Sequence, residues 1–256
     1  MPEIVILLPT KNEEDGLGEV IDRIPTSEIV EKGYSPRVIV VDGNSTDSTC
    51  SIAKERGVEL IHQKSSPGKG WGFREAIQVI YNGREPNGDL LVMLDADATY
   101  SPEEIPEFIE QLQEVDIVWG SRLRGDIEEG AMSTTNKFGN RVLSKWASLV
   151  FLKRTTDLCT GFWGFRTEIL RNLSISAKGF TLEAELFALS VRNHLSTSEI
   201  PIDYASREGK SSLKWYIDGP RIFLATFRKR FEYNRRPLHD LIFVSAFAVL
   251  LASFLV

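Results

Sequence analysis

Short apolar runs alternate with longer amphipathic segments along the first half of the chain. The runs typical of strands cover residues 3–8, 37–41, 58–62, 90–94 and 115–120. Between them, apolar residues recur at helical spacing, as in the segment 73–81. Strands that alternate with helices through short connections predict an α/β fold with a mostly parallel sheet and helices on both faces.

Four of the predicted strands are followed by polar loops, at residues 11–15, 42–47, 95–99 and 121–124. Because the carboxyl ends of parallel strands lie at one edge of a sheet, we expect these loops to gather there. The central run ends in Asp95 and Asp97, one residue apart. Such a pair suits a hard divalent cation, Mg²⁺ or Mn²⁺, that also binds substrate phosphates, although taken alone Asp-x-Asp is more often a solvated turn.

The second half of the chain has a different pattern. Two segments, 138–152 and 213–231, carry aromatic and aliphatic residues on one side and basic residues on the other. Helices of this kind lie either in the plane of a bilayer interface or against the sheet. For 213–231 we favour the interface, because it leads into a basic cluster and an apolar tail. Between them we expect a turn-rich aromatic stretch at 157–166, a helix at 181–193 and a final strand at 199–204.

The carboxyl end of the chain, 238–256, is almost wholly apolar. At 1.5 Å per residue, its 19 residues would span about 28 Å as a helix, just enough to cross the hydrocarbon core. We therefore expect a transmembrane helix, with a buried core helix as the alternative, and leave open whether the span is truncated. The basic cluster before it predicts that the body of the chain lies on the cytoplasmic face of the cell membrane or an endomembrane. The cluster consists of Arg228, Lys229, Arg230, Arg235 and Arg236.

The composition narrows the class of protein. At 256 residues with 42% hydrophobic content, the chain can bury the core of one large domain. A net charge of -6 argues against non-specific nucleic-acid binding. Cys50 and Cys159 follow no metal-type or disulfide-type spacing, so we expect reduced thiols. The start of the chain shows no signal-peptide pattern.

Several common catalytic motifs are missing from the sequence. The Gly-Lys-Gly of 68–70 lacks the flanking residues of a P-loop, and no Gly-x-Gly-x-x-Gly follows the first strand. His62, His194 and His239 are isolated, which is more typical of structural or surface residues than of catalytic ones. ATP hydrolysis and nicotinamide chemistry therefore find no support.

The remaining polar residues suit a nucleoside diphosphate leaving group. Asp42 can accept hydrogen bonds from a base or a ribose, and Asp95 with Asp97 can hold a metal on the diphosphate. Arg122 and Arg207 add fixed positive charge to neutralise the charge that develops on the leaving group.

Eight short motifs follow one another along the chain and cover nearly all of it up to residue 213. They are Leu-Pro-Thr-Lys-Asn-Glu at 8–13, Val-Asp-Gly-Asn-Ser-Thr-Asp at 41–47, Gly-Lys-Gly at 68–70, Asp-Ala-Asp at 95–97, Gly-Ser-Arg at 120–122, Asn-Arg at 140–141, Gly-Phe through Arg at 161–166, and Arg-x-Gly-x-Ser at 207–211. In this order they resemble glycosyltransferase family 2, and within it the dolichyl- and polyprenyl-phosphate sugar synthases of the dolichol-phosphate mannose synthase type.

The resemblance implies a GT-A fold, a Rossmann-like mostly parallel sheet, over residues 1–212, with a first interface helix at about 136–152. A second interface helix and basic segment would cover 213–236, and the transmembrane helix 238–256. The implied reaction is inverting transfer of a sugar from a GDP- or UDP-linked nucleotide sugar to a membrane dolichyl or polyprenyl phosphate, as in protein glycosylation. No nucleic acid is expected as a partner.

The resemblance also implies roles for single residues. Asp95 and Asp97 would bind Mg²⁺ or Mn²⁺, Arg122 and Arg141 would hold the lipid phosphate, and Arg207 would close over the donor diphosphate. Asp97, Arg122 and Arg141 would form the catalytic set. The residues implied around the nucleotide sugar are Pro9, Lys11, Glu13, Val41, Asp42, Gly43, Lys69, Asp95, Ala96, Asp97, Arg207 and Lys210.

The sequence departs from the family pattern at three places. Thr99 stands where relatives often have Gln, so either Thr99 or water would complete the metal shell. Gly43 replaces the second of two acids, which leaves the base open. The ending Gly-x-Ser-Lys-Leu appears as Gly-Lys-Ser-Ser-Leu at 209–213, so Lys210 or Lys214 would supply the lysine.

Two other functions stay open at this point. One is transfer to a hydroxyl of a glycan or glycolipid, which would need a carboxylate base such as Asp157, whereas a phosphate monoester is mostly dianionic and needs none. The Gln-x-x-Arg-Trp motif of processive polysaccharide synthases is absent. The other is a catalytically silent membrane scaffold. The sequence does not fix the sugar, the nucleotide, the lipid chain length or the oligomeric state.

Overall fold

The computed structural model of the chain describes residues 1–64, 68–81, 88–179, 181–207 and 215–233. Within this part of the chain, seven strands form one sheet in the order β3-β2-β1-β4-β6-β5-β7. Neighbouring strands are parallel, except that β6 is antiparallel to β4 and β5. The predicted mostly parallel sheet is therefore confirmed. The strands are β1 (Glu3–Thr10), β2 (Ser35–Asp42), β3 (Glu59–His62), β4 (Leu90–Met93), β5 (Ile117–Ser121), β6 (Trp163–Arg166) and β7 (Thr197–Pro201).

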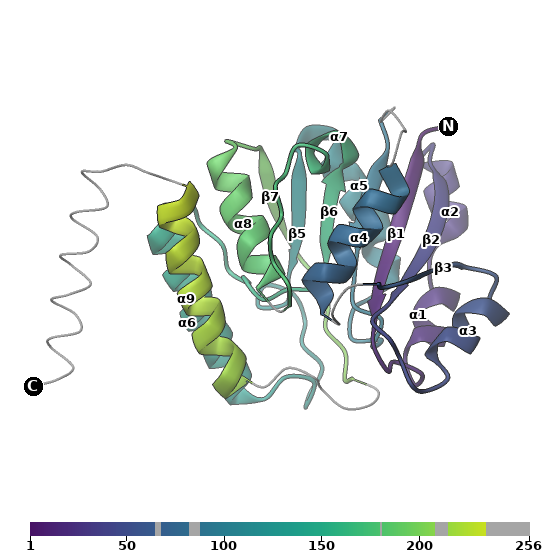
Figure 1. Ribbon diagram of the computed structural model, residues 1–256, viewed down its shortest axis with the longest axis horizontal. Helices are drawn as coiled ribbons and strands as arrows, with labels where there is room; N and C mark the ends of the chain where they lie inside the picture. The colour runs from purple at the N-terminus through teal and green to yellow at the C-terminus, as the bar shows by residue number, and fades with distance from the viewer. Residues whose placement is uncertain (65–67, 82–87, 180, 208–214, 234–256) are drawn as a thin grey trace, which may run out of the picture.

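Helices cover both faces of the sheet, as the prediction required (Figure 1). One face carries α1, α2, α3 and α5, and the other carries α4 and α8, with α6 and α9 packed beside α8. The helices are α1 (Leu17–Asp22), α2 (Thr26–Glu31), α3 (Thr49–Glu55), α4 (Lys69–Tyr81), the 3₁₀ helix η1 (Pro102–Glu104), α5 (Ile105–Glu114), α6 (Thr134–Phe151), α7 (Thr167–Leu170), α8 (Leu182–Arg192) and α9 (Trp215–Tyr233).

Two apolar cores form, one on each face, because alternate residues of a strand point to opposite sides of the sheet. In β1, Val5 and Leu7 join the core beneath α4 and α8, whereas Ile4 and Ile6 join the core beneath α1 and α5. All four residues of β4 are buried, as expected for a central strand with helices on both sides. The sheet is therefore rigid where β4 ends.

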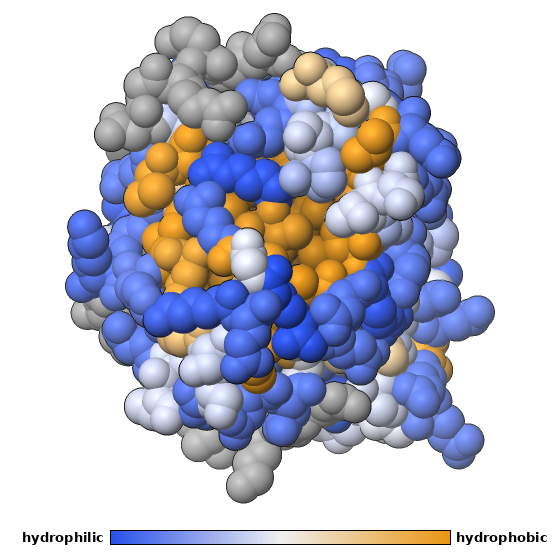
Figure 2. Space-filling model, turned by 90° about the vertical axis from the view of Figure 1, so that its right-hand side faces the viewer, coloured by the Kyte–Doolittle hydropathy of each residue, from blue (hydrophilic) through white to orange (hydrophobic). Residues whose placement is uncertain are grey.

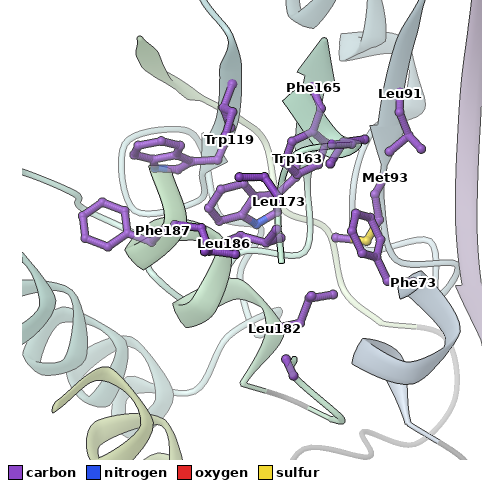
Figure 3. Close-up of a cluster of buried hydrophobic side chains, with 14 of the residues drawn as sticks. Phe73, Leu91, Met93, Trp119, Trp163, Phe165, Leu173, Leu182, Leu186 and Phe187 are labelled. Carbon is purple, nitrogen blue, oxygen red and sulfur yellow. The ribbon is translucent and has the colours of Figure 1, made fainter. Parts of the chain in front are cut away.

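The core beneath α8 is rich in aromatic residues (Figure 3). Trp119 of β5 and Trp163 of β6 lie with their ring centroids 5.3 Å apart, and the edge of Phe187 meets Trp119 at 5.7 Å. On the side nearer α4, Phe165 packs on Phe73 at 6.0 Å. Large buried rings of this kind bury much apolar area each, so they anchor β5 and β6 firmly.

The strand β6 corrects the sequence prediction of a turn-rich stretch over 157–166. Trp163 and Phe165 point into the core with α8, while Gly164 faces α5. A Cβ on Gly164 would lie 3.0 Å from the ring of Phe108, so only glycine lets this strand approach α5 without displacing that ring. The strand was not predicted because it is only four residues long and a glycine interrupts its apolar pattern. The final strand also begins and ends earlier than expected, at Thr197–Pro201 rather than 199–204.

The two amphipathic segments form α6 and α9, which pack against each other. The indole of Trp146 on α6 stacks on Phe223 of α9 with ring centroids 4.3 Å apart. At the other end of α9, Lys229 binds the buried carboxylate of Glu185 on α8 at 2.6 Å. Part of the apolar side of each helix is therefore buried against the rest of the protein.

An apolar stripe on α6 is left exposed. Phe138 is 68% exposed and Leu149 59%, and Val142 and Leu152 lie at helical spacing with them. None of the described helices is long and apolar enough to span a membrane. The predicted span 238–256 lies outside the described residues, as do the predicted domain boundaries next to residues 212 and 236.

The face at the β3 end of the sheet carries a hydrophobic area framed by hydrophilic residues (Figure 2). Here β3 pairs only with the second half of β2. The start of β2 pairs with β1 but has no described strand on the β3 side; there Pro36 has no N–H to offer, and Arg37 forms an ion pair with Glu59 at 2.6 Å. Proline and charge on an edge strand discourage pairing with another chain.

Candidate functional site

The carboxyl ends of the parallel strands meet at one edge of the sheet, opposite the N-terminus labelled in Figure 1. Asp42 ends β2, and the loop after β4 carries Asp95 and Asp97. The register pairs Pro9 with Val41 at the end of β1 and β2. The predicted gathering of loops is confirmed, and it brings carboxylates from two strands to one edge.

Asp95 is held by a lysine from α4, the helix that precedes β4 in the chain. The ammonium group of Lys69, at the start of α4, lies 2.6 Å from Asp95 Oδ1 and 2.8 Å from Glu183 Oε1. Burial alone lowers the pKa of Lys69, but the carboxylates of Asp95 and Glu183 more than offset this and raise it. Lys69 is therefore a fixed cation beside Asp95, and its second partner, Glu183, was not predicted.

Asp97 is held by Arg207, the last residue of the described range 181–207. Arg207 lies 2.8 Å from Asp97 Oδ2 through one terminal nitrogen and 2.7 Å from Glu13 Oε1 through the other. The other oxygen of Asp97 accepts a hydrogen bond from the Thr99 hydroxyl at 2.6 Å. Thr99 thus binds Asp97 itself, at the position where relatives often have Gln.

Two carboxyl groups of this cluster have raised pKa values. Burial raises the pKa of Asp97, and the nearby charge of Asp95 raises it further, against the opposing effect of Arg207. Burial also raises the pKa of Glu13 to about 7, again with Arg207 opposing and Asp97 adding to the rise. The acids repel one another, so a divalent cation bound between them would be stabilised.

The loop that carries the two acids is strained and tightly packed. Ala98 has a φ of 59°, a left-handed conformation that non-glycine residues seldom adopt and that is often found at functional sites. A Cβ on Gly161 would lie 2.3 Å from Asp95 Oδ2, and a Cβ on Gly16 would lie 2.8 Å from the backbone of Asp97. Both glycines therefore let the chain close around the carboxylates.

Asp42 forms a second polar group, beside the first strand pair. It is buried, and it accepts a hydrogen bond from the backbone N–H of Ser45 at 3.0 Å, while the ring nitrogen Nδ1 of His62 lies 3.4 Å away. Burial raises the pKa of Asp42, but hydrogen bonds from Ser45, Cys50 and His62 outweigh it and lower the pKa overall. Asp42 is therefore held in its carboxylate form by these neighbours. The positions of Cys50 and His62 beside it were not predicted.

A third group lies beneath the strand ends. The carboxylate of Asp157 is fully buried and binds Arg122 through two nitrogens, at 2.7 and 2.8 Å, while Asn140 of α6 donates to it at 2.6 Å. The guanidinium also faces the rings of Tyr100 and Tyr204. Burial lowers the pKa of Arg122, but Asp157 raises it well above its usual value. This pair is closed to solvent, so Asp157 is not placed to act as a base.

The predicted site residues fall into three sets. One cluster consists of Lys69, Asp95, Asp97, Glu13 and Arg207. The neighbouring strand ends carry Pro9, Val41, Asp42 and Gly43, and Ala96 is buried. Lys11 and Arg141 are exposed, and Lys210 lies outside the described residues. The roles of these single residues stay predictions.

The residues present fit a hard divalent cation. The donors are all carboxylate oxygens, which Mg²⁺ and Mn²⁺ prefer, and Asp95 is 34% exposed, so a cation can reach it. The Nε of Arg207 is buried and has no hydrogen-bond partner among the described residues, so it can donate to an oxygen of a bound ligand. Asp95 and Asp97 would hold the cation, which would supply positive charge and Lewis acidity toward a diphosphate.

Comparison with known proteins is consistent with this geometry. The family model described as glycosyl transferase family 2 matches residues 5–174. The glycosyltransferase AglJ of Haloferax volcanii is 30% identical over 229 residues, which cover 88% of this chain and 71% of that protein. A dolichyl-phosphate hexose transferase of the same organism is 29% identical over 224 residues, 86% of this chain and 90% of that protein.

Among solved structures, the glucosyl-3-phosphoglycerate synthase of Mycobacterium tuberculosis, crystallised with Mn²⁺, uridine diphosphate and phosphoglyceric acid, superposes with a TM-score of 0.69. The match covers 90% of this chain and 78% of that one at 19% sequence identity. At this identity the likeness establishes the shared fold alone.

Proposed function

Since the chain belongs to glycosyl transferase family 2, we propose that it transfers a hexose from a nucleotide sugar to a polyprenyl phosphate at a membrane surface. The observation that carries the proposal is the position of α6. Its Asn140 binds Asp157 beneath the strand ends, while its exposed side bears the apolar stripe of Phe138, Val142, Leu149 and Leu152. One helix thus connects a candidate donor site with a surface suited to lipid.

The donor half of the proposal rests on charge. A nucleoside diphosphate leaving group gains negative charge as the glycosidic bond breaks, and Lys69 and Arg207 are fixed cations beside Asp95 and Asp97. A bound Mg²⁺ or Mn²⁺ would add Lewis acidity on the diphosphate. Asp42, at the end of β2, would accept hydrogen bonds from the nucleoside. A solved structure with the same fold was crystallised with Mn²⁺ and uridine diphosphate, which supports a donor of this chemical class.

The acceptor half rests on the burial of Asp157. A hydroxyl acceptor would need a carboxylate base, and Asp157 was the candidate, but both of its oxygens are bound by Arg122 in a dry site. A phosphate monoester is mostly dianionic near neutral pH and attacks without a base. The relative described as a dolichyl-phosphate hexose transferase acts on an acceptor of this kind. A phosphate acceptor is therefore favoured over a hydroxyl.

The acceptor phosphate needs cations, and two arginines were predicted to supply them. Arg141 is exposed and directly follows Asn140, so it lies one residue from the Asp157 group. The charge of Arg122 is already balanced by Asp157. We therefore assign the phosphate contact to Arg141 first, with Arg122 fixing the strand end behind it. Direct attack by the phosphate oxygen on the anomeric carbon would invert the configuration at that carbon. We further propose that the active site faces the cytoplasm.

The test is an acceptor assay on the full chain in detergent or vesicles. Labelled GDP- and UDP-linked sugars are offered with polyprenyl phosphate, or with a glycan hydroxyl acceptor, with and without chelator. We expect product only on the polyprenyl phosphate and loss of product with chelator. Product on the hydroxyl acceptor alone would overturn the proposal. Absence of any thermal stabilisation by a nucleoside diphosphate with Mn²⁺ would instead indicate a scaffold.

The role of the apolar stripe has its own control. Leu149→Ser should lower transfer to polyprenyl phosphate in vesicles by about tenfold, because each buried apolar side chain contributes about 1.5–3 kcal/mol of membrane affinity at most. Val79→Ser changes an equally exposed residue on α4 and should leave transfer unchanged. Equal effects of the two variants would argue against α6 as the lipid-facing surface.

A further inference from the structure

Three side chains of different chemistry converge beside the strand ends, outside the Asp95–Asp97 cluster. Asp42 comes from the end of β2, Cys50 from the first turn of α3, and His62 from the end of β3. One ligand atom from each, a carboxylate oxygen, a thiol sulfur and a ring nitrogen, lies within 4.8 Å of the other two. Neither the spacing of the cysteines nor the isolated histidines in the sequence indicated this cluster.

We propose that Asp42, Cys50 and His62 form a binding site for Zn²⁺ or a similar borderline cation. The chemistry separates this site from the neighbouring one. Thiolate and imidazole ligands select Zn²⁺ over Mg²⁺ and Mn²⁺, whereas the two carboxylates of Asp95 and Asp97 select the harder cations. The two sites would therefore hold different metals in the same protein.

The positions of the three groups are close to those that Zn²⁺ requires. Zn–S bonds of about 2.3 Å and Zn–N and Zn–O bonds of about 2.0–2.2 Å place tetrahedral ligand atoms about 3.3–3.6 Å apart. His62 Nδ1 and Asp42 Oδ2 are already 3.4 Å apart. The widest separation in the cluster, at most 4.8 Å, would have to close by about 1.3 Å at most.

Two features allow that small closure. The side chain of His62 is 60% exposed at the end of an edge strand, and Cys50 is half-buried in the first turn of a short helix. Asp42 is the fixed member, held by the backbone N–H of Ser45. Binding would convert the Cys50 thiol to a thiolate and release its proton to solvent. Three protein ligands leave the fourth position for water or a bound ligand.

The site would regulate the enzyme by competition. This step rests on the proposed function, in which Asp42 accepts hydrogen bonds from the nucleoside of the donor. A cation on Asp42 occupies the same carboxylate oxygens, so Zn²⁺ and the nucleotide sugar would exclude each other. Zn²⁺ would therefore inhibit transfer even when the hard-cation site is saturated with Mg²⁺.

Cobalt spectroscopy on the full chain tests the site without any need for activity. Co²⁺ replaces Zn²⁺ in such sites, and a cobalt–thiolate bond gives an intense charge-transfer band in the near ultraviolet that oxygen ligands cannot give. Under reducing conditions we expect this band to saturate at one Co²⁺ per chain and to be lost on addition of Zn²⁺. The band should disappear in Cys50→Ser. In His62→Ala, the apparent affinity for Co²⁺ should fall at least tenfold.

Two variants serve as controls for the band. Cys159→Ser removes the only other cysteine, and Asp97→Asn alters the hard-cation cluster, so both should keep the band. No band in the wild-type protein, or a band that survives Cys50→Ser, would overturn the site. Both results are independent of whether the chain transfers a sugar to a polyprenyl phosphate.

The inhibitory role is tested separately by activity. At saturating Mg²⁺, Zn²⁺ should inhibit the wild-type enzyme in competition with the nucleotide sugar, and the inhibition constant should rise at least tenfold in Cys50→Ser. Inhibition of equal strength in both proteins would overturn the competition. A failure to find any transferase activity would instead bear on the proposed function, while the cobalt result would stand.

Discussion

Two groups of charged side chains lie near the same strand ends, and they differ in their access to water. Asp95 and Asp97 are paired with Lys69 and Arg207; Asp97 is buried, but Asp95 is 34% exposed and opens the pair to water. Asp157 is paired with Arg122 in a similar way, yet it is fully buried. We call the first the open group and the second the closed group. The same kinds of ion pair thus serve two different purposes.

The difference follows from desolvation. An ion pair that water can reach rearranges at little cost, so the pairing at the exposed Asp95 can rearrange when a substrate diphosphate binds. A buried carboxylate that loses its partner stays uncompensated at a cost of several kcal/mol. The closed group therefore cannot open during a reaction, and its role is to hold β5 and α6 in position. Four experiments can break or sharpen this comparison.

The largest effect is expected from Asp97→Asn in the open group. Transferase activity should fall at least about 10³-fold, or about 4 kcal/mol in the transition state, because a metal ligand is lost. The free energy of unfolding should change by less than about 1 kcal/mol, since the charge removed is one of two that repel each other. Asp22→Asn, at a surface ion pair with Arg56, is the control and should keep full activity. Activity within tenfold of wild type in Asp97→Asn would contradict this assignment.

Asp157→Ala should have the opposite profile. The free energy of unfolding, measured with denaturant, should fall by about 3 kcal/mol because Arg122 remains buried without its partner. The double variant Asp157→Leu with Arg122→Met should recover most of that loss, since a buried ion pair is often replaced by apolar residues without cost. A loss below about 1 kcal/mol in the single variant would show that the closed group is not closed.

Gly161→Ala tests how tightly the open group is packed. The new Cβ would lie 2.3 Å from Asp95 Oδ2, so the carboxylate must move, and we expect activity to fall by about 10- to 100-fold. Gly139→Ala is the matched control, because nothing lies within 4 Å of a Cβ there. Titration of Mn²⁺ by calorimetry should show weaker binding in Gly161→Ala only. Wild-type Mn²⁺ affinity in that variant would mean that Asp95 need not hold its position.

The smallest effect concerns the pH dependence of stability. Burial raises the pKa of Glu13 to about 7 from 4.5, so between those values the folded protein keeps a proton that the unfolded chain has released. The stability contributed by this group is therefore present below pH 4.5 and is lost as the pH rises through 7. We expect a loss of about 1 kcal/mol between pH 5 and 8 in chelator, after solvent screening is allowed for. Glu13→Gln should lack this loss, and an equal loss in both proteins would contradict it.

The sequence predicted the fold well where local patterns decide it. Apolar runs gave β1, β2 and β4 within a few residues, and the loops after them brought Asp95 and Asp42 to one edge as expected. The family motifs led directly to Glu13 and Arg207, whose contact joins residues 194 positions apart. The pattern succeeds here because parallel strands run in one direction, so the loops after them must lie at the same edge of the sheet.

Other features depend on contacts that no local pattern encodes. Glu183 reaches Lys69 from a helix far along the chain, and Cys50 meets His62 only because β3 pairs beside β2. Asp157 looked like a candidate base, and its complete burial beside Arg122 could not be inferred from the sequence. In each case the chemistry of a residue was visible in the sequence, and its surroundings were not.

The first turn of α8 carries two acids with separate duties. Glu183 binds Lys69 in the open group, and Glu185 binds Lys229 of α9. Residues two positions apart on a helix are rotated by about 200°, so the two carboxylates face nearly opposite ways from one rigid turn. The same turn of α8 therefore joins two ion pairs, one to the start of α4 beside Asp95 and one to α9, so the orientation of α9 and the position of Lys69 are both fixed by a single helix end.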